Sequence, residues 1–254
     1  MKKIIQERLL NIQKEKNIKI LFSSESGSRG WGFPSPDSDY DVRFFYVRSK
    51  NEYLSISDGK DQYDFPINDL LDINGWDIRK ALRLMMKSNA SPLEWLQSPI
   101  VYMEESGIRE EIFNLAKKYF IPRATAHHYL GISKNLLEQG IVGEEFKIKK
   151  YFYVLRSLLS AKWIIDKNEI APMEFHLLME QIQNRTELVE AINILWEKKK
   201  IALEGALTAV QPIIHDFVKT EFARCDEAVK NIERRDNDKT ELDIFFRKII
   251  EQYG

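Results

Sequence analysis

The spacing of hydrophobic positions changes along the chain. Near the amino end, apolar residues recur at helical intervals over residues 3–16, with charged residues between them, and predict an amphipathic helix. Two runs rich in β-branched and aromatic residues, 18–22 and 40–47, then predict strands. A short third strand is expected over residues 62–67, where Pro66 favours an edge position in the sheet.

Helical spacing dominates from residue 74 onward. Asn74 is interpreted as a helix N-cap with Asp77 three residues later, and Asp77 as part of this helix start rather than as a ligand. Strands followed by a run of helices predict an α+β fold: a small head over residues 1–120, with a mixed sheet and flanking helices, and an all-helical domain over residues 121–254. Further helices are expected over residues 91–97, 107–119, 122–139, 144–167, 173–182, 186–203, 206–230 and 239–252.

Composition excludes several classes of function. The 254 residues carry 38 basic and 39 acidic side chains, so a basic surface that coats nucleic acid is not expected. A single cysteine, Cys225, excludes a disulfide framework and a cysteine metal cluster, and four histidines make a histidine-rich zinc site improbable. The sequence has no run of roughly 20 apolar residues that would span a membrane. We therefore expect a cytoplasmic protein without a membrane partner.

The candidate chemistry lies between the first two predicted strands. Gly27 allows the backbone to approach a ligand closely, and Ser28 offers an N–H and a hydroxyl to phosphate oxygens. Ten residues later, Asp39 and Asp41 stand two apart at the start of a strand, so both side chains leave one face, about 6.6 Å apart along the chain. Arg43 continues on that face. Two neighbouring carboxylates favour a hard divalent cation such as Mg²⁺.

This arrangement resembles the polymerase-β-like nucleotidyltransferase superfamily: a hydrophobic strand, Gly-Ser, about ten residues, and then Asp-x-Asp. The longer run over residues 25–44, together with residues 71–82 and 94–102, is similar to the nucleotidyltransferases associated with RNA-ligase repair operons. The resemblance implies a catalytic nucleotidyltransferase head followed by a helical domain. It also implies two bound Mg²⁺ ions, with Mn²⁺ as an alternative, and a third carboxylate on a neighbouring strand.

Three aspartates compete for the place of this third carboxylate. Asp64 alternates with apolar Tyr63 and Phe65, and this alternation predicts that Asp64 faces the site. Asp72 has apolar neighbours on both sides but stands close to the predicted helix start. Asp61 is two residues from Tyr63, so it would point to the same side of the strand as Tyr63, toward the core. Asp39, Asp41 and Asp64 are therefore the predicted catalytic and metal-binding residues, with Asp72 as the alternative.

The expected function is the transfer of a nucleoside monophosphate from a nucleoside triphosphate to an acceptor hydroxyl, with release of pyrophosphate. The acceptor is left open between an RNA 3′ end, a protein and a small molecule, and a non-catalytic nucleotide- or RNA-binding regulator is the alternative function. Lys149, Tyr153 and Arg156 share one face of a predicted helix, where they offer further nucleotide contacts or form a solvated surface. The predicted nucleotide-binding residues are Gly27, Ser28, Arg29, Arg43, Lys149, Tyr153 and Arg156.

Overall fold

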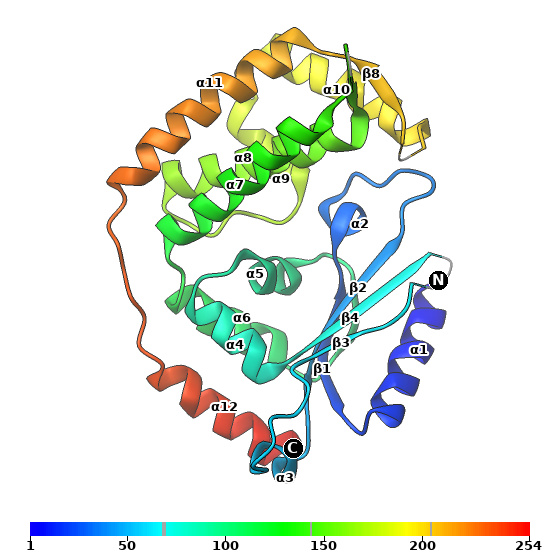
Figure 1. The fold of residues 1–254 in the computed structure, drawn as a ribbon, viewed down its shortest axis with the longest axis vertical. Helices are drawn as coiled ribbons and strands as arrows, with labels where there is room; N and C mark the ends of the chain where they lie inside the picture. Colours follow the sequence, from blue (N-terminus) through cyan, green and yellow to red (C-terminus); the bar gives the residue numbers. More distant parts are fainter. Residues whose placement is uncertain (68–69, 143, 204) are drawn as a thin grey trace. The chain divides into compact units, whose positions relative to one another are not determined.

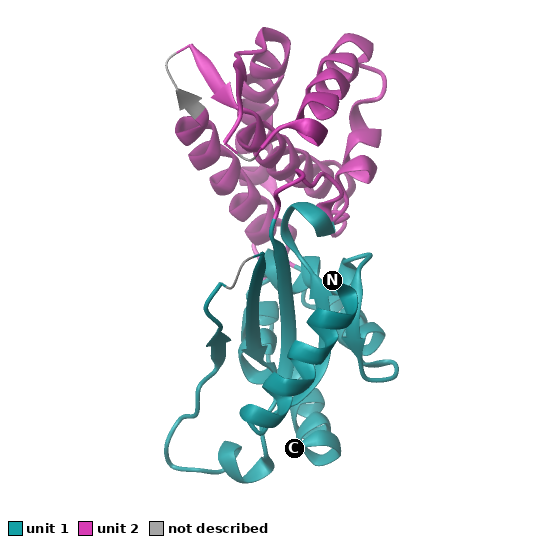
Figure 2. Cartoon of the chain, turned by 90° about the vertical axis from the view of Figure 1, so that its right-hand side faces the viewer, with its two compact units in different colours: residues 1–30, 39–120, 236–254 teal, residues 31–38, 121–235 magenta. Residues whose placement is uncertain are grey.

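The computed structural model describes residues 1–67, 70–142, 144–203 and 205–254. They form two compact units (Figure 2): unit 1 comprises residues 1–30, 39–120 and 236–254, and unit 2 comprises residues 31–38 and 121–235. One boundary thus follows residue 120. Two segments depart from a simple division of the chain there: residues 31–38, between Gly-Ser and Asp-x-Asp, belong to unit 2, and the last 19 residues belong to unit 1.

Unit 1 is built on a five-stranded mixed sheet (Figure 1). Its strand order is β3-β4-β2-β1-β5, in which β2 and β4 are parallel and the other neighbours are antiparallel. The two strands that carry the predicted chemistry therefore lie in the interior of the sheet. Their bounds are β1 (Lys19–Glu25), β2 (Tyr40–Val47), β3 (Gln62–Asp64), β4 (Leu71–Asp77) and β5 (Val101–Glu104).

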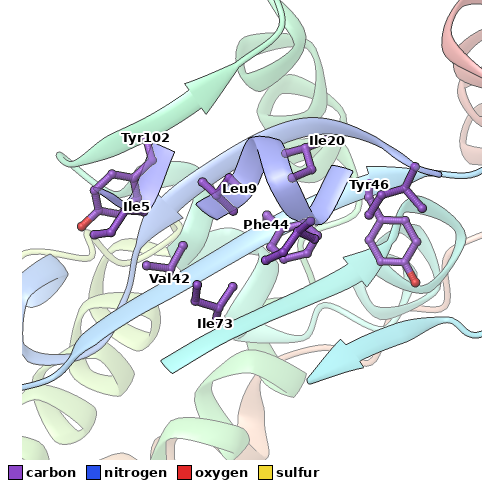
Figure 3. Packing of buried hydrophobic residues seen from close by; sticks show 10 residues of the cluster. Ile5, Leu9, Ile20, Val42, Phe44, Tyr46, Ile73 and Tyr102 are labelled. Atoms are coloured by element: carbon purple, nitrogen blue, oxygen red, sulfur yellow. The ribbon is translucent and has the colours of Figure 1, made fainter. Parts of the chain in front are cut away.

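Helix α1 (Lys2–Glu15) covers one face of this sheet. Its apolar stripe, which includes Ile5 and Leu9, packs against Val42, Phe44 and Ile73 of the sheet (Figure 3). Each of these five side chains is at most 4% exposed. The period-two alternation in β2 thus directs its even-numbered residues to this core, as predicted.

Strand β4 differs from the sequence-based prediction, because residues 71–77 form a strand and the helix begins only at Ile78. Asn74 is therefore not a helix N-cap. Asp77 has that role, and its side chain accepts a hydrogen bond from the backbone N–H of Arg79 at 2.8 Å. Gly75 is required inside the strand, since a Cβ there would lie 2.1 Å from the ring of Phe44.

The other face of the sheet is aromatic at one end of the strands and polar at the other. Helices α4 (Ile78–Met86), α5 (Ala90–Gln97) and α6 (Ile108–Lys118) lie on this side, opposite α1 (Figure 1). At the carboxyl ends of β2 and β4 the face is aromatic: Trp95 of α5 stacks on Trp76 at 4.1 Å and lies 5.3 Å from Phe45. At the amino ends it carries polar side chains. Unit 1 is completed by α2 (Gly27–Trp31, whose last residue belongs to unit 2), α3 (Lys50–Tyr53) and α12 (Thr240–Tyr253).

Unit 2 is mainly helical, but the prediction of an all-helical domain is wrong, because the unit also contains a small antiparallel sheet. The three short strands are β6 (Ile141–Val142), β7 (Glu145–Lys147) and β8 (Leu207–Ala209). Strands β7 and β8 occupy segments where helices are expected from the sequence, and β6 lies between two expected helices. Phe146 of β7 is fully buried and lies 4.2 Å from the ring of Tyr151. The helices are α7 (Pro122–Gly140), α8 (Ile148–Lys167), α9 (Phe175–Met179), η1 (Glu180–Ile182), α10 (Thr186–Ile201), α11 (Pro212–Ala228) and η2 (Val229–Asn231).

No helix in the described part of the chain combines the length and the apolar character that a membrane span needs.

Candidate active site

The parallel pairing of β2 and β4 places two carboxylates side by side. Asp41 stands opposite Asp72, and Arg43 opposite Asn74. One guanidinium nitrogen of Arg43, Nη2, contacts Asp41 Oδ1 at 2.8 Å and Asp72 Oδ2 at 2.7 Å. The side chains of Arg43, Asp41 and Asp72 are 16%, 26% and 32% exposed. The site is therefore a partly open cluster in which two acidic groups share one cation.

Gly27 lies against the carboxylate of Asp41. Its φ is +57°, and a Cβ at this position would lie 1.9 Å from Asp41 Oδ2. The neighbouring Ser26 N–H donates to the carbonyl oxygen of Asp41 at 2.8 Å. Glycine is thus needed for two independent reasons, the backbone conformation and the close approach to Asp41.

Arg29 joins the two ends of the segment between Gly-Ser and Asp-x-Asp. Its Nε donates to the carbonyl oxygen of Asp39 at 3.1 Å, and its guanidinium lies 3.9 Å from the centre of the Tyr40 ring. Asp39 is half-buried immediately before β2, and Ser28 is only 4% exposed. The structure therefore brings Gly27 to Asp41 and Arg29 to Asp39, with Ser28 buried between Gly27 and Arg29 in the chain, and the contact of these residues with a nucleotide stays a prediction.

Glu25 is a buried site residue that the sequence analysis missed. One of its carboxylate oxygens accepts the backbone N–H of Asp41 at 2.7 Å, and the other accepts the hydroxyl of Tyr102. Burial raises the pKa of Glu25, and burial together with this hydrogen bond raises the pKa of Tyr102. Glu25 stands opposite the core residue Val42. A carboxylate at a strand position that faces the core is unusual, and this feature of the sequence could have identified Glu25 as a site residue.

The structure places Asp64 away from Asp41. Strand β3 pairs with the far side of β4, where Asp64 stands opposite Asn74 and accepts hydrogen bonds from the side chains of Asn74 and Gln62. Asp64 faces the expected side of the sheet but is exposed at its edge, one strand beyond β4. Asp72, the alternative, is the carboxylate that lies beside Asp41, because the register between two distant segments aligns them.

The donor chemistry of this site fits a divalent cation. Carboxylate oxygens of Asp41 and Asp72 converge on a single point, which Arg43 Nη2 occupies, and hard oxygen ligands suit Mg²⁺ and Mn²⁺. Among the residues that the structure describes, no group of three or more His, Cys, Asp or Glu side chains is arranged as a ready-made metal site. The two converging carboxylates therefore match the expected ion in ligand type, while the Arg43 guanidinium occupies the point between them.

The predicted nucleotide contacts in α8 lie within unit 2, where they hold the segment 31–38. Tyr153 packs edge-on against Trp31 at 5.1 Å, and the guanidinium of the buried Arg156 lies 4.1 Å from the Trp31 ring centre. Lys149 lies 5.5 Å from the ring of Tyr153. The three residues share a face, as predicted, and two of them contact the segment that leads into Asp-x-Asp. Their contact with a nucleotide stays a prediction.

Residues 1–248 match a family model described as "RlaP: RNA repair pathway DNA polymerase beta family". The chain belongs to this family. Membership in RlaP confirms the resemblance inferred from the Gly-Ser and Asp-x-Asp motifs and supports nucleotidyl transfer as the general class of activity.

The chain is also similar to a curated protein and, distantly, to a solved structure. It is 43% identical over 253 residues to "Uncharacterized protein YcgL" of Bacillus subtilis (strain 168), covering 99% of this chain and 97% of that protein. A solved structure of a nucleotidyltransferase-like protein from Exiguobacterium sibiricum 255-15 matches with a TM-score of 0.32 and 9% identity, covering 89% of this chain and 74% of that one. The family assignment rests on the match of residues 1–248, not on this distant structural likeness.

Proposed function

We propose that this protein is a Mg²⁺-dependent nucleotidyltransferase that transfers a nucleoside monophosphate from a nucleoside triphosphate to an acceptor hydroxyl and releases pyrophosphate. The observation that carries the proposal is the convergence of Asp41 and Asp72 on one point, next to Gly27. Asp39, Asp41 and Asp72 are the proposed ion ligands, and Asp72 replaces Asp64 as the proposed third carboxylate. Ions held there would neutralise the phosphates and polarise the attacking hydroxyl.

Each residue around the carboxylates has a role that follows from its contacts. Gly27 allows the backbone of this turn to lie directly against the carboxylate of Asp41, since it presents no side chain there. Arg29 brings a positive charge to the start of the same turn. In this proposal Asp72, whose side chain is 32% exposed, accepts the proton of the attacking hydroxyl. Positioning and charge neutralisation account for most of the catalysis in transfers of this kind.

The proposed acceptor is the 3′ hydroxyl of an RNA. The support for this choice is the family description, which names an RNA repair pathway. The near-neutral charge of the chain disfavours a long nucleic-acid track but is compatible with a 3′ end, which needs few contacts. A protein hydroxyl is the other acceptor class to be tested.

A direct test measures label transfer from each of four α-³²P-labelled nucleoside triphosphates with Mg²⁺. The acceptor panel contains RNA with a free 3′ hydroxyl, the same RNA with a blocked 3′ end, and a mixture of proteins. We expect transfer to the free 3′ end, lowered at least about 100-fold in Asp41→Asn and Asp72→Asn, because each variant removes one charge from the ion site.

Asp64→Asn is the matched control for this test. Asp64 has the same side chain and faces the same side of the sheet, but it lies opposite Asn74 at the edge. We expect its transfer rate to stay within threefold of the unchanged protein. If Asp64→Asn abolishes transfer while Asp72→Asn does not, the proposed third carboxylate is wrong; if Asp41→Asn leaves turnover intact, the proposed activity is wrong.

The second candidate function is a non-catalytic nucleotide- or RNA-binding regulator. The observation that favours it is Arg43, whose guanidinium already binds both Asp41 and Asp72 and compensates one of their two negative charges. Calorimetry with a non-hydrolysable triphosphate, combined with an assay for pyrophosphate, separates the two functions. Binding without pyrophosphate release for every acceptor would favour the regulator.

A further inference from the structure

The guanidinium of Arg43 is surrounded by oxygen atoms. Nη2 contacts a carboxylate oxygen of Asp41 and one of Asp72, and Nη1 donates to the carbonyl oxygens of Asp72 and Val42 at 2.9 and 3.2 Å. Such a set of oxygen ligands also suits a hard metal ion. Arg43 therefore occupies a position whose neighbouring oxygens stabilise a cation.

We propose that Arg43 is an internal counter-ion that closes the metal position of the nucleotide-free protein and competes with the divalent ion. In this proposal, which rests on the proposed function, Arg43 leaves Asp41 and Asp72 when the ion enters and transfers its contacts to the phosphates of the triphosphate. The nucleotide and the metal would then bind cooperatively, because the triphosphate supplies the partner that the displaced guanidinium needs.

The permanent positive charge of the Arg43 guanidinium makes it compete with a divalent ion for the oxygens of Asp41 and Asp72. A guanidinium does not lose its proton in proteins, so the charge of Arg43 cannot be neutralised in place. A divalent ion that shares the oxygens of Asp41 and Asp72 would be repelled by Arg43 at hydrogen-bond distance. The repulsion ends only if the side chain moves. Arg43 is 16% exposed and thus borders solvent, and a guanidinium binds phosphate oxygens as well as it binds carboxylates.

The test measures Mn²⁺ binding, by electron paramagnetic resonance of the free ion and by calorimetry, without any turnover. For the unchanged protein we expect weak binding that strengthens at least tenfold when a non-hydrolysable triphosphate is added. For Arg43→Gln we expect Mn²⁺ alone to bind at least tenfold tighter than to the unchanged protein, with little further gain from the triphosphate. The double variant Asp41→Asn/Arg43→Gln should lose this gain, which locates the ion at Asp41.

Two further variants keep the result decisive. Arg43→Lys retains the charge but not the forked donor that bridges two carboxylates, so its Mn²⁺ affinity should lie between that of the unchanged protein and that of Arg43→Gln. Arg8→Gln removes a guanidinium from an exposed pair with Glu15 and should leave Mn²⁺ binding unchanged. If Arg43→Gln does not fold, Arg43→Lys decides. Mn²⁺ binding to the folded variant that is no tighter than to the unchanged protein overturns the proposal.

Failure of this inference is distinguishable from failure of the proposed function. If no acceptor is labelled but Mn²⁺ binds tighter to Arg43→Gln, the competition stands and the transferase activity is wrong. If transfer depends on Asp41 and Asp72 while Mn²⁺ binds equally to the unchanged protein and to Arg43→Gln, the activity stands and the competition is wrong.

Discussion

An arginine binds aspartate near each end of the ladder that β2 and β4 share. The two clusters contain the same residue types but differ in burial and in charge balance. At one end Arg43 bridges Asp41 and Asp72. At the other end Arg48, the residue after β2, binds Asp77, the last residue of β4, through Nε at 2.8 Å. The same two side-chain types near opposite ends of one ladder therefore allow a direct comparison of their environments.

The Arg48–Asp77 pair is closed. The two side chains are 5% and 0% exposed, and Asp77 also accepts hydrogen bonds from the hydroxyl of Tyr53 and the backbone N–H of Arg79, both at 2.8 Å. The backbone of Gly59 lies against the guanidinium, where a Cβ would be 1.5 Å from Nη1. One carboxylate with three donors leaves no space or charge for a ligand, so this end of the ladder is structural.

The Arg43 cluster has the opposite balance. Two carboxylates share one guanidinium, all three side chains reach solvent, and the helix that covers the aromatic end of the face does not bury them. An excess of negative charge at an accessible place favours the entry of a cation. What separates a structural ion pair from a candidate active site in this protein is thus charge balance and access, not residue type.

The largest effect on stability is expected from Arg48→Met. Removal of the cation leaves Asp77 buried without its charge partner, which should lower the free energy of unfolding by about 3–5 kcal/mol. Urea denaturation, with hydrogen exchange of the peptides that cover β2 and β4, measures the loss. Arg8→Met is the control, because the exposed Arg8–Glu15 pair should contribute less than about 1 kcal/mol. Equal losses in both variants would contradict the structural assignment of Arg48.

Gly27→Ala and Gly107→Ala separate backbone strain from the close approach to Asp41. Both glycines have positive φ, +57° and +75°, but a Cβ meets Asp41 Oδ2 at Gly27 and finds nothing within 4 Å at Gly107. We expect a cost of about 1–2 kcal/mol for Gly107→Ala from the left-handed conformation alone. Gly27→Ala should add about 1–3 kcal/mol for overpacking and should also displace the Asp41 carboxylate.

Denaturation and nucleotide transfer, measured on the same two variants, check this prediction. Gly107→Ala should keep its transfer rate, whereas Gly27→Ala should lose it. Equal destabilisation together with equal activity would show that Asp41 tolerates a side chain at position 27.

The features of the site that depend on a single segment of the chain could be predicted from the sequence. The alternation Asp41-Val42-Arg43-Phe44 assigns each side chain to its face, and the structure confirms it through the burial of Val42 and Phe44. Strand β4 could not be predicted in the same way. A glycine such as Gly75 argues against a strand when only the local sequence is considered. Glycine is required at this position because the ring of Phe44, on a neighbouring strand, packs against it.

The identity of the third carboxylate depends on register rather than on pattern. Asp64 and Asp72 both alternate correctly, and only the pairing of β4 with β2 on one side and β3 on the other decides which lies beside Asp41. The register between distant strands is set by packing across the sheet, as with Phe44 over Gly75. The spacing of residues within one segment does not predict this register.

Glu25 should give unit 1 a pH-dependent stability that the Arg43 cluster does not explain. Because burial raises its pKa in the folded state, folded Glu25 keeps a proton that the unfolded chain releases near pH 4.3. The free energy of unfolding should therefore fall as the pH rises from that value through the folded pKa, by up to about 1.4 kcal/mol per pH unit. Urea denaturation at a series of pH values measures this slope.

Two variants at this position sharpen the result. Glu25→Gln should remove the slope while it keeps an oxygen to accept the Asp41 N–H. Tyr102→Phe should extend the slope to higher pH, since the Tyr102 hydrogen bond lowers the pKa of Glu25. An unchanged slope in Glu25→Gln would assign the pH dependence to another group.

The smallest effect is expected at the edge of the polar face. Asp64→Asn replaces an exposed side chain whose partners, Asn74 and Gln62, are neutral amides, so the free energy of unfolding should change by less than about 0.5 kcal/mol. Mn²⁺ affinity should also be unchanged, because Asp64 lies beyond β4 and shares no contact with Arg43 or Asp41 in the described hydrogen bonds. Parallel titrations of Asp64→Asn and Asp72→Asn check this. A loss of Mn²⁺ binding in Asp64→Asn alone would show that the ion binds at the edge of the sheet and not between β2 and β4. The Arg43 cluster would then no longer differ from the Arg48–Asp77 pair as a metal site.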